Sequence, residues 1–372
     1  MENTRNVTNA LLIGVLLFLF TFAPVSPALA QQSWEKEWKE TIAAAKKEGK
    51  VVLATNPSTE MRRDIGSRFK ARFGIPVEFI AGRTSQTAAR LRTERRARVY
   101  TVDVAIGGAG TMSRTMYPEK MLDPLKPALI LPEVVDPSKW KTGGLWFIDP
   151  EKKFALRLLY YVGSAIFVNT DYVKIEEFKS IKELLNPKWK GKISVRDPTA
   201  GGGGAGDAAV LYTQFGEEFV KGVYIDQKPR ISRDDRQLAD WLARGSYPIS
   251  IGADTGEVEL LRKEGLPVAT IHRLPDMKPV TKSSLGVLAL MNRAPHPNAA
   301  KVFVNWIASK EGLEIFGRTA AYPTTRNDID ELSYAAPELI PRPGVAYFDT
   351  GGWGFTDARE KVRLRMKELL RR

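Results

Sequence analysis

The sequence predicts an α/β protein of two lobes, with parallel-rich sheets flanked by helices and with crossing segments that form a hinge. Predicted strands alternate with helices of roughly ten to fifteen residues, a pattern typical of βαβ units. Residues 31–372 also form a chain longer than a single hydrophobic core usually supports, so two domains are expected. Turns rich in small and polar residues follow several of the strands, and such turns gather at one edge of a parallel sheet, where ligands bind.

The first elements predict one lobe. A stretch rich in Lys, Glu and Ala over 34–47 predicts a helix that Gly49 ends, and KVVLAT predicts a buried strand. The same alternation then repeats, so a sheet covered by helices on both faces is expected. The repeats comprise a helix over 60–73, the strand IPVEFIAG, a helix over 84–98 and the strand VDVAIGG.

The later elements predict the second lobe and a return to the first. A Pro-rich stretch over 118–137 interrupts regular structure, and the apolar segment FALRLLYYVGSAIFVNTD, with a bend at Gly163, is expected to cross between lobes. SIKELLNPKWKGKISVRD predicts a helix, a turn and a strand. The remaining predicted elements are helices over 207–219 and 234–244, the strands YPISIGAD, LPVATIH and SLGVLALM, an amphipathic helix in PNAAKVFVNWIASKEGLEIFG, and a basic helical tail over 357–370.

These elements set the predicted domain limits. The tail is expected to pack on the lobes. The limits are a leader over 1–30, the first part of lobe 1 over 31–155, lobe 2 over 156–272, a return to lobe 1 over 273–315, and a C-terminal helical segment over 316–372.

The N-terminal residues predict an exported protein. Arg5 precedes an apolar run over 10–23, which is shorter than the about twenty residues that span a bilayer. Ala28-Leu29-Ala30 has the small residues that signal peptidase requires, so cleavage near Ala30 and a periplasmic location are expected; a membrane-anchored N-terminus is the alternative. The chain has no cysteine, which excludes disulfides, thiolate metal sites and a lipid-acceptor cysteine.

The charge of the chain favours anionic ligands. The net charge is +13, which attracts acidic partners without selecting among them. Export argues against nucleic acid as a partner, and the basic run RLRTERRARVY is typical of a solvated helix face. The basic tail leaves two alternatives, a solvated helix or attraction to anionic lipid.

Four consecutive glycines in RDPTAGGGGAGDAAVLY stand between a predicted strand and a predicted helix. Gly201, Gly203 and Gly206, with Asp226 downstream, match the spacing of a dinucleotide fingerprint, but that motif belongs in the first βα turn of its domain. A P-loop is excluded because no Lys-Ser or Lys-Thr follows. Glycines let a ligand approach the backbone, and a helix N-terminus favours an anion; a plain surface turn is the alternative.

The sequence predicts no catalytic residue, metal site or cofactor. His272 and His296 are the only histidines, and each is predicted to lie at a turn or strand end. Tyr160 and Tyr161 are adjacent in a strand, so their side chains should point to opposite faces rather than into one iron site. Arg196, like Arg83, stands where a strand becomes a turn, and a guanidinium there can bind a phosphate, phosphonate or carboxylate.

The predicted ligand-binding residues come from these turns and from the hinge. They are Asn56, Ser58, Arg83, Ser85 and Gly108 in the first lobe, Tyr161 and Ser164 in the crossing segment, and Arg196, Thr199, Gly203, Gly204, Asp254 and Thr255 in the second lobe.

Several stretches resemble one family. They are WEKEWKETIAAAKKEGKVVLATNPS, IPVEFIAGRTSQTAARLRTERR, YPISIGADTGEVELLRKEGLPV and HPNAAKVFVNWIASKEGLEIFGRTAAYPTTRND. They are similar to the extracellular solute-binding proteins of bacterial ABC importers, in the subgroup of ferric-iron, thiamine, aminoethylphosphonate and polyamine binders. The resemblance implies a type II-like periplasmic binding-protein fold, a ligand in the cleft between the lobes, and a permease in the inner membrane as partner.

The resemblance also bears on the ligand. Where iron-binding members have a tyrosine pair, this chain has Ala253-Asp254-Thr255, so an organic phosphate, phosphonate or carboxylate is expected, bound by a monomer. A ferric-iron or thiamine binder of the same fold is an alternative. A secreted hydrolase acting on a small anion is the alternative from another class.

Overall fold

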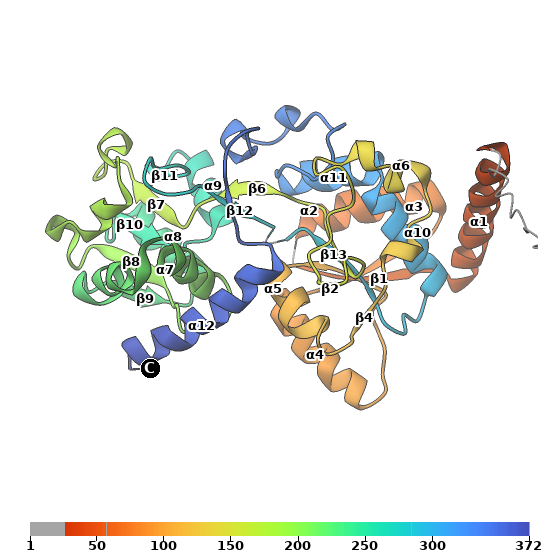
Figure 1. Ribbon diagram of the computed structural model, residues 1–372, viewed down its shortest axis with the longest axis horizontal. Helices are drawn as coiled ribbons and strands as arrows, with labels where there is room; N and C mark the ends of the chain where they lie inside the picture. Colours follow the sequence, from red (N-terminus) through yellow and green to blue (C-terminus); the bar gives the residue numbers. More distant parts are fainter. Residues whose placement is uncertain (1–26, 57, 284, 372) are drawn as a thin grey trace, which may run out of the picture.

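The computed structural model describes residues 27–56, 58–283 and 285–371; for residues 27–32 it describes the backbone only. The predicted leader therefore lies largely outside the described residues. Two groups of sheets and helices lie side by side along the long axis, with α1 at one end of the molecule (Figure 1). No helix in the described part of the chain combines the length and the apolar character needed to cross a bilayer.

The first sheet forms the core of lobe 1. Its order is β2-β1-β3-β13-β4, with β5 paired to β13. The first three strands are parallel, and β13 runs antiparallel to β3. Every residue of β1 is buried, as expected for a strand covered by helices on both faces. The strands are β1 (Val51–Thr55), β2 (Val77–Ala81), β3 (Val104–Gly107), β4 (Leu122–Asp123), β5 (Ala155–Arg157) and β13 (Val287–Met291).

Aromatic side chains pack the helices of lobe 1 onto this sheet. The ring of Phe69 lies 5.1 Å from that of Phe303 and 5.3 Å from that of Trp306, so two segments far apart in sequence share one core. The helices are α1 (Pro27–Glu48), α2 (Thr59–Met61), the π-helical η1 (Arg62–Gly66), α3 (Ser67–Phe73), α4 (Thr84–Arg96), α5 (Ala109–Thr111), the π-helical η2 (Met112–Met116), α6 (Pro132–Val135), α10 (Pro297–Ala308) and α11 (Lys310–Ala320).

The second sheet forms the core of lobe 2. Its order is β11-β7-β10-β8-β9; β8 is parallel to β9 and β10, whereas β7 is antiparallel to β10. The strands are β7 (Ile166–Asn169), β8 (Ile193–Arg196), β9 (Arg230–Ser232), β10 (Ile249–Ile251) and β11 (Val268–Thr270). The helices are α7 (Gly203–Lys221), the π-helical η8 (Gly222–Asp226), α8 (Asp235–Ala243) and α9 (Thr255–Lys263).

A small third sheet links the lobes. In its order β14-β12-β6, strand β6 (Tyr161–Gly163) lies between β5 and β7 in the chain, and β12 (Val280–Lys282) lies between β11 and β13. Both crossings between the large sheets therefore run through neighbouring antiparallel strands, β6 and β12. Strand β14 (Phe348–Asp349) pairs with the other edge of β12. This arrangement is the expected hinge, and the predicted domain limits remain predictions.

Some helices differ from the sequence-based expectation. The helix expected over 207–219 begins at Gly203, inside the glycine run. The single helix expected in PNAAKVFVNWIASKEGLEIFG is two helices, because Ser309 is extended and its hydroxyl accepts the amide hydrogen of Gly312. The tail helix, α12 (Trp353–Leu369), packs on lobe 2, where its Val362 and Met366 are buried in the core.

Candidate functional site

A chamber of about 610 Å³ lies between turns of the two lobes, and we call it the first chamber. It is formed where β1 and β2 of lobe 1 and β8 and β10 of lobe 2 end, with the hinge strands at its base. Nine predicted residues line it: Asn56, Arg83, Ser85, Tyr161, Arg196, Gly203, Gly204, Asp254 and Thr255. The turns that the sequence singled out therefore converge.

Thr84 holds the lobe 1 wall together. Its hydroxyl donates to Oδ1 of Asn56 at 3.3 Å and accepts the amide hydrogen of Gly108 at 3.0 Å. One side chain thus connects the turns after β1, β2 and β3. A Cβ atom at Gly107 would overlap Thr84, so a glycine is needed for this close approach. Arg83 directly precedes Thr84 in the chain, and its side chain is exposed at the edge of the chamber.

The glycine turn and α7 form the lobe 2 wall. Gly202 has φ +113°, a conformation that glycine adopts readily, and a Cβ at Gly204 would overlap the carbonyl oxygen of Asp197. The amides of Gly203 and Gly204, at the start of α7, have no hydrogen-bond acceptor among the described residues. These amides and the helix dipole are suited to bind an anion.

Asp235 joins the two lobes. Its Oδ2 accepts a hydrogen bond from Arg83 of lobe 1 at 3.1 Å, and its Oδ1 accepts one from Arg196 of lobe 2. The same carboxylate therefore neutralises two guanidinium groups across the cleft. Nearby, Asp197 binds the Nε of Arg233 at 2.8 Å and accepts from the hydroxyl of Thr199 at 2.6 Å.

A lysine and two tyrosines form the base of the chamber. Lys282 of β12 donates to the carbonyl oxygen of Ser164 at 2.8 Å and lies 3.4 Å from Asp207. Tyr161 stacks on Tyr322, with ring centroids 3.9 Å apart. Burial raises the pKa of Tyr322 well above its usual range, and the neighbouring Tyr161 and Asp254 raise it further. A phenolate is therefore disfavoured here.

Four predicted residues lie elsewhere. Ser58 caps α2 by accepting from the amide of Met61, and Thr199 is buried with its hydroxyl on Asp197. Ser164 is buried too, and its hydroxyl donates to the carbonyl oxygen of Ile271 at 2.5 Å. None of these three lines the first chamber. Gly108 lines a neighbouring chamber of about 540 Å³, the second chamber.

Asp254 lines the first chamber but also has a structural role. Its Oδ1 accepts from the amides of Gly256 and Glu257 at 2.9 and 3.2 Å, which caps α9. Sequence reasoning missed Asp235, Arg233, Lys282 and Tyr322. For Asp235 a signal existed, because it lies in the first turn of the helix predicted over 234–244; for Lys282 and Tyr322 the local sequence has none.

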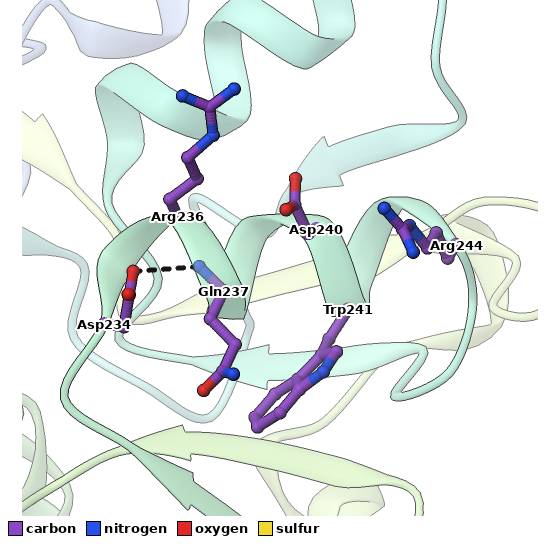
Figure 2. A pocket seen from close by; sticks show the side chains of 6 residues that line it. All are labelled: Asp234, Arg236, Gln237, Asp240, Trp241 and Arg244. Carbon is purple, nitrogen blue, oxygen red and sulfur yellow. Dashed lines mark hydrogen bonds between the residues drawn. The ribbon is translucent and has the colours of Figure 1, made fainter.

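A third hollow, of about 290 Å³, lies along α8 outside the cleft. Figure 2 shows that Arg236 and Trp241 project from α8 in different directions, and that the Asp234 carboxylate accepts from the amide of Gln237, at 3.1 Å. The hollow is lined by Asp234, Arg236, Gln237, Asp240, Trp241 and Arg244, two acids and two bases that balance in charge. It therefore does not favour an anion.

The two histidines lie outside the chambers. The His296 ring binds the buried Asp103 at 2.9 Å beside the start of α10, and burial lowers the pKa of His272. Within residues 27–56, 58–283 and 285–371, no group of three or more His, Cys, Asp or Glu side chains could hold a metal ion. The cleft can bind a polar solute, and it has no histidine base.

Comparison with known proteins shows the fold. A Haemophilus influenzae protein described as uncharacterized is 23% identical over 281 residues, covering 73% of this chain and 76% of that protein. AfuA of Actinobacillus pleuropneumoniae, a periplasmic binding protein solved with fructose-6-phosphate, superposes with a TM-score of 0.67 at 19% identity, covering 87% of this chain and 99% of that one. Iron-bound HitA of Pseudomonas aeruginosa gives 0.64 at 17% identity, with 85% and 99% coverage.

These structures are two-lobed periplasmic binding proteins, so the predicted fold class is confirmed. Residues 64–341 match the model of a family described as bacterial extracellular solute-binding protein. Because that match spans well over half of the chain, the protein belongs to the bacterial extracellular solute-binding protein family.

Proposed function

We propose that this protein captures a small organic anion in the cleft between its lobes, in the periplasm, and delivers it unaltered to the permease of an ABC importer. The proposed ligand carries a phosphate, phosphonate or carboxylate. The first chamber has a size typical of small-molecule sites, which range over roughly 300–1,000 Å³.

The observation that carries the proposal is the arrangement of charge in the first chamber. Its four basic and four acidic side chains balance in number, but they differ in exposure. The side chains of Asp197 and Asp207 are 3% and 7% exposed, whereas those of Arg83 and Arg233 are 64% and 73% exposed. Asp197 and Asp207 are therefore less accessible to a ligand than Arg83 and Arg233, whose guanidinium groups keep N–H donors for a ligand.

Ferric iron is less well supported. Iron-binding phenolates must lose their protons, and burial opposes this at Tyr322. HitA was solved with iron, and AgtB of Agrobacterium tumefaciens R10, at 15% identity and a TM-score of 0.61 with 87% of this chain and 99% of that one covered, was solved with agropinic acid. Proteins of this fold thus hold chemically different ligands. The ligand class of this chain is therefore inferred from the side chains that line its cleft.

Thermal unfolding of the purified protein tests the proposal. We expect inorganic phosphate, fructose 6-phosphate or a small carboxylate to raise the melting temperature, because a ligand that binds only the folded state stabilises it. Arg196→Ala should reduce the shift. Arg244→Ala, which removes a cation from the outer face of α8, is the matched control and should keep it. A shift that Arg196→Ala leaves unchanged, or a shift with ferric citrate or thiamine alone, would contradict the proposal.

A further inference from the structure

The second chamber extends the cleft beyond the first. It is formed by the turn after β3, by the glycine turn and by α12 near the C-terminus. Gly203, Asp207 and Lys282 line both chambers, so the two meet along the first turn of α7. Two further guanidinium groups line it, those of Arg114 from η2 and Arg359 from α12.

Arg359 is held against the backbone of lobe 1. A Cβ atom at Gly110 would overlap its guanidinium group, so the guanidinium lies directly over this glycine. Its stem passes Gly206 of lobe 2, where a Cβ would lie 3.7 Å from Cδ. The side chain thus reaches from the C-terminal helix into the space between the lobes.

Arg359 has no ion-pair partner within the part of the chain that the structure describes. Among the described residues, no acid lies within ion-pair distance of it and no hydrogen bond is made by its side chain. Its neighbour in the chain, Glu360, is bound by Arg363 at 2.6 Å, and Arg114 is paired with Asp357 at 3.2 Å. Burial lowers the pKa of Arg359, and the like charge of Arg114 lowers it further.

This arrangement is unusual for a purely structural residue. Arg359 is half-buried, and a cation partly removed from water is normally paired with a counter-ion and hydrogen-bond acceptors. Here the donors of Arg359 face a chamber large enough for a ligand group, with glycine backbone around it. A counter-ion supplied by the ligand would complete the site.

We propose that the cleft binds a solute with two separated anionic groups, one at Arg196 in the first chamber and the other at Arg359 and Arg114 in the second. The proposal rests on the proposed function and makes it more specific. Its ligand class is an organic phosphate that carries a second phosphate or a carboxylate. Helix α12 then contributes directly to ligand binding.

Inorganic phosphate tests the two sites without knowledge of the natural ligand. We expect phosphate to raise the melting temperature of the wild type through both sites, and Arg359→Gln and Arg196→Ala each to retain part of the shift. The double variant should retain none. Lys361→Gln, which removes an exposed cation from the same helix, is the matched control and should behave as the wild type. Arg359→Gln should fold, because it removes an unpaired charge.

A matched pair of sugar phosphates gives the second measurement. By calorimetry, fructose 1,6-bisphosphate should bind the wild type more tightly than fructose 6-phosphate. Arg359→Gln should lower the affinity for the bisphosphate by about 10- to 100-fold, the range for hydrogen bonds to charged groups. The affinity for the monophosphate should stay unchanged. Arg359→Gln with a full phosphate shift, or an unchanged preference between the two sugars, would overturn the two-anion site alone. A wild type that neither phosphate, fructose 6-phosphate nor a small carboxylate stabilises would overturn the proposed function as well.

Discussion

Asp235 has the position that an anionic ligand group would take. It binds Arg83 and Arg196 together, and both guanidinium groups line the first chamber. A carboxylate in this place competes with a ligand for N–H donors and repels its charge. Arg83 and Asp235 are partly solvated, so their ion pair contributes little to stability. Asp235 is therefore better described as an internal counter-ion than as a structural contact.

Asp235→Asn should consequently tighten anion binding. We expect about a tenfold increase in affinity for the anion that stabilises the wild type best, equivalent to roughly 1.4 kcal/mol. Isothermal titration calorimetry measures it directly. Asp240→Asn, on the same helix but in the outer hollow, is the control and should leave the affinity unchanged. Weaker binding by Asp235→Asn would mean that the carboxylate instead holds the guanidinium groups in place for the ligand.

The four glycines of the turn are not equivalent. A Cβ at Gly204 would overlap the carbonyl oxygen of Asp197, a backbone atom that cannot easily move, whereas Gly201 has open space around it and no positive φ. Gly204→Ala should therefore reduce the free energy of unfolding by about 1–3 kcal/mol, the usual range for overpacking. Gly201→Ala should change it little. Urea unfolding of the ligand-free variants compares them, and equal stabilities would refute the close approach.

At the scale of single residues, the sequence predicted the cleft better than it predicted the roles within it. Arg83 and Arg196 follow strands and line the chamber, as their position suggested. Ser58, Ser164 and Thr199 occur in the same kinds of turn, but their hydroxyls are used by the local backbone or by Asp197. Small polar residues close turns as readily as they bind ligands, so the local sequence cannot separate the two uses.

At the scale of elements, α12 is fixed to α7 by an ion pair. Arg365 binds both oxygens of Glu217 at 2.8 and 2.9 Å, and Lys221 lies 3.2 Å from the same carboxylate. Hydrogen bonds from Arg365 and Lys221 lower the pKa of Glu217 from 4.5 to about 2. The helix that carries Arg359 therefore depends on a carboxylate that stays ionised in acid.

This pKa has a defined consequence for stability. Because the pKa of Glu217 is lower in the folded state, its contribution is fully present above pH 4.5 and is lost as the pH falls towards 2. Glu217→Gln should thus be less stable than the wild type at pH 7, and the difference should shrink at pH 3. Urea unfolding at the two pH values measures it. Glu368→Gln, which removes the exposed partner of Arg365, should reduce the free energy of unfolding less. If the stability difference between Glu217→Gln and the wild type is the same at both pH values, the ion pair is contradicted.

Strands with an apolar composition, such as β1, were predictable, whereas the short strands β4, β9, β12 and β14 were not predicted. VVLAT is apolar except for its last residue, Thr55, and it is buried throughout. Helix limits were harder. In PNAAKVFVNWIASKEGLEIFG the apolar periodicity passes through Ser309, yet its hydroxyl caps a second helix and Gly312 packs against the carbonyl of Trp306. A serine can cap a helix or lie within one, and the local sequence does not separate the two uses.

At the scale of the whole molecule, the cleft depends on segments that are distant in the chain. Lys282 reaches the first chamber from a hinge strand, Tyr322 from the end of lobe 1, and Arg359 reaches the second chamber from the C-terminal helix. Periodicity and spacing describe near neighbours only, so these side chains could not be placed from the sequence. The same dependence makes the site sensitive to the relative position of the lobes.

Closure of the lobes should therefore accompany ligand binding. A ligand that contacts both walls binds the closed state more tightly and shifts the population towards it. The chain has no cysteine, so Arg96→Cys on α4 and Lys263→Cys on α9 provide two unique spin-label sites on exposed helices of different lobes. We expect saturating phosphate, or the most stabilising anion, to shift the measured distance distribution. The pair Arg96→Cys and Lys70→Cys, both within lobe 1, should not respond; a response there, or none between lobes, would argue against hinge closure about β6 and β12.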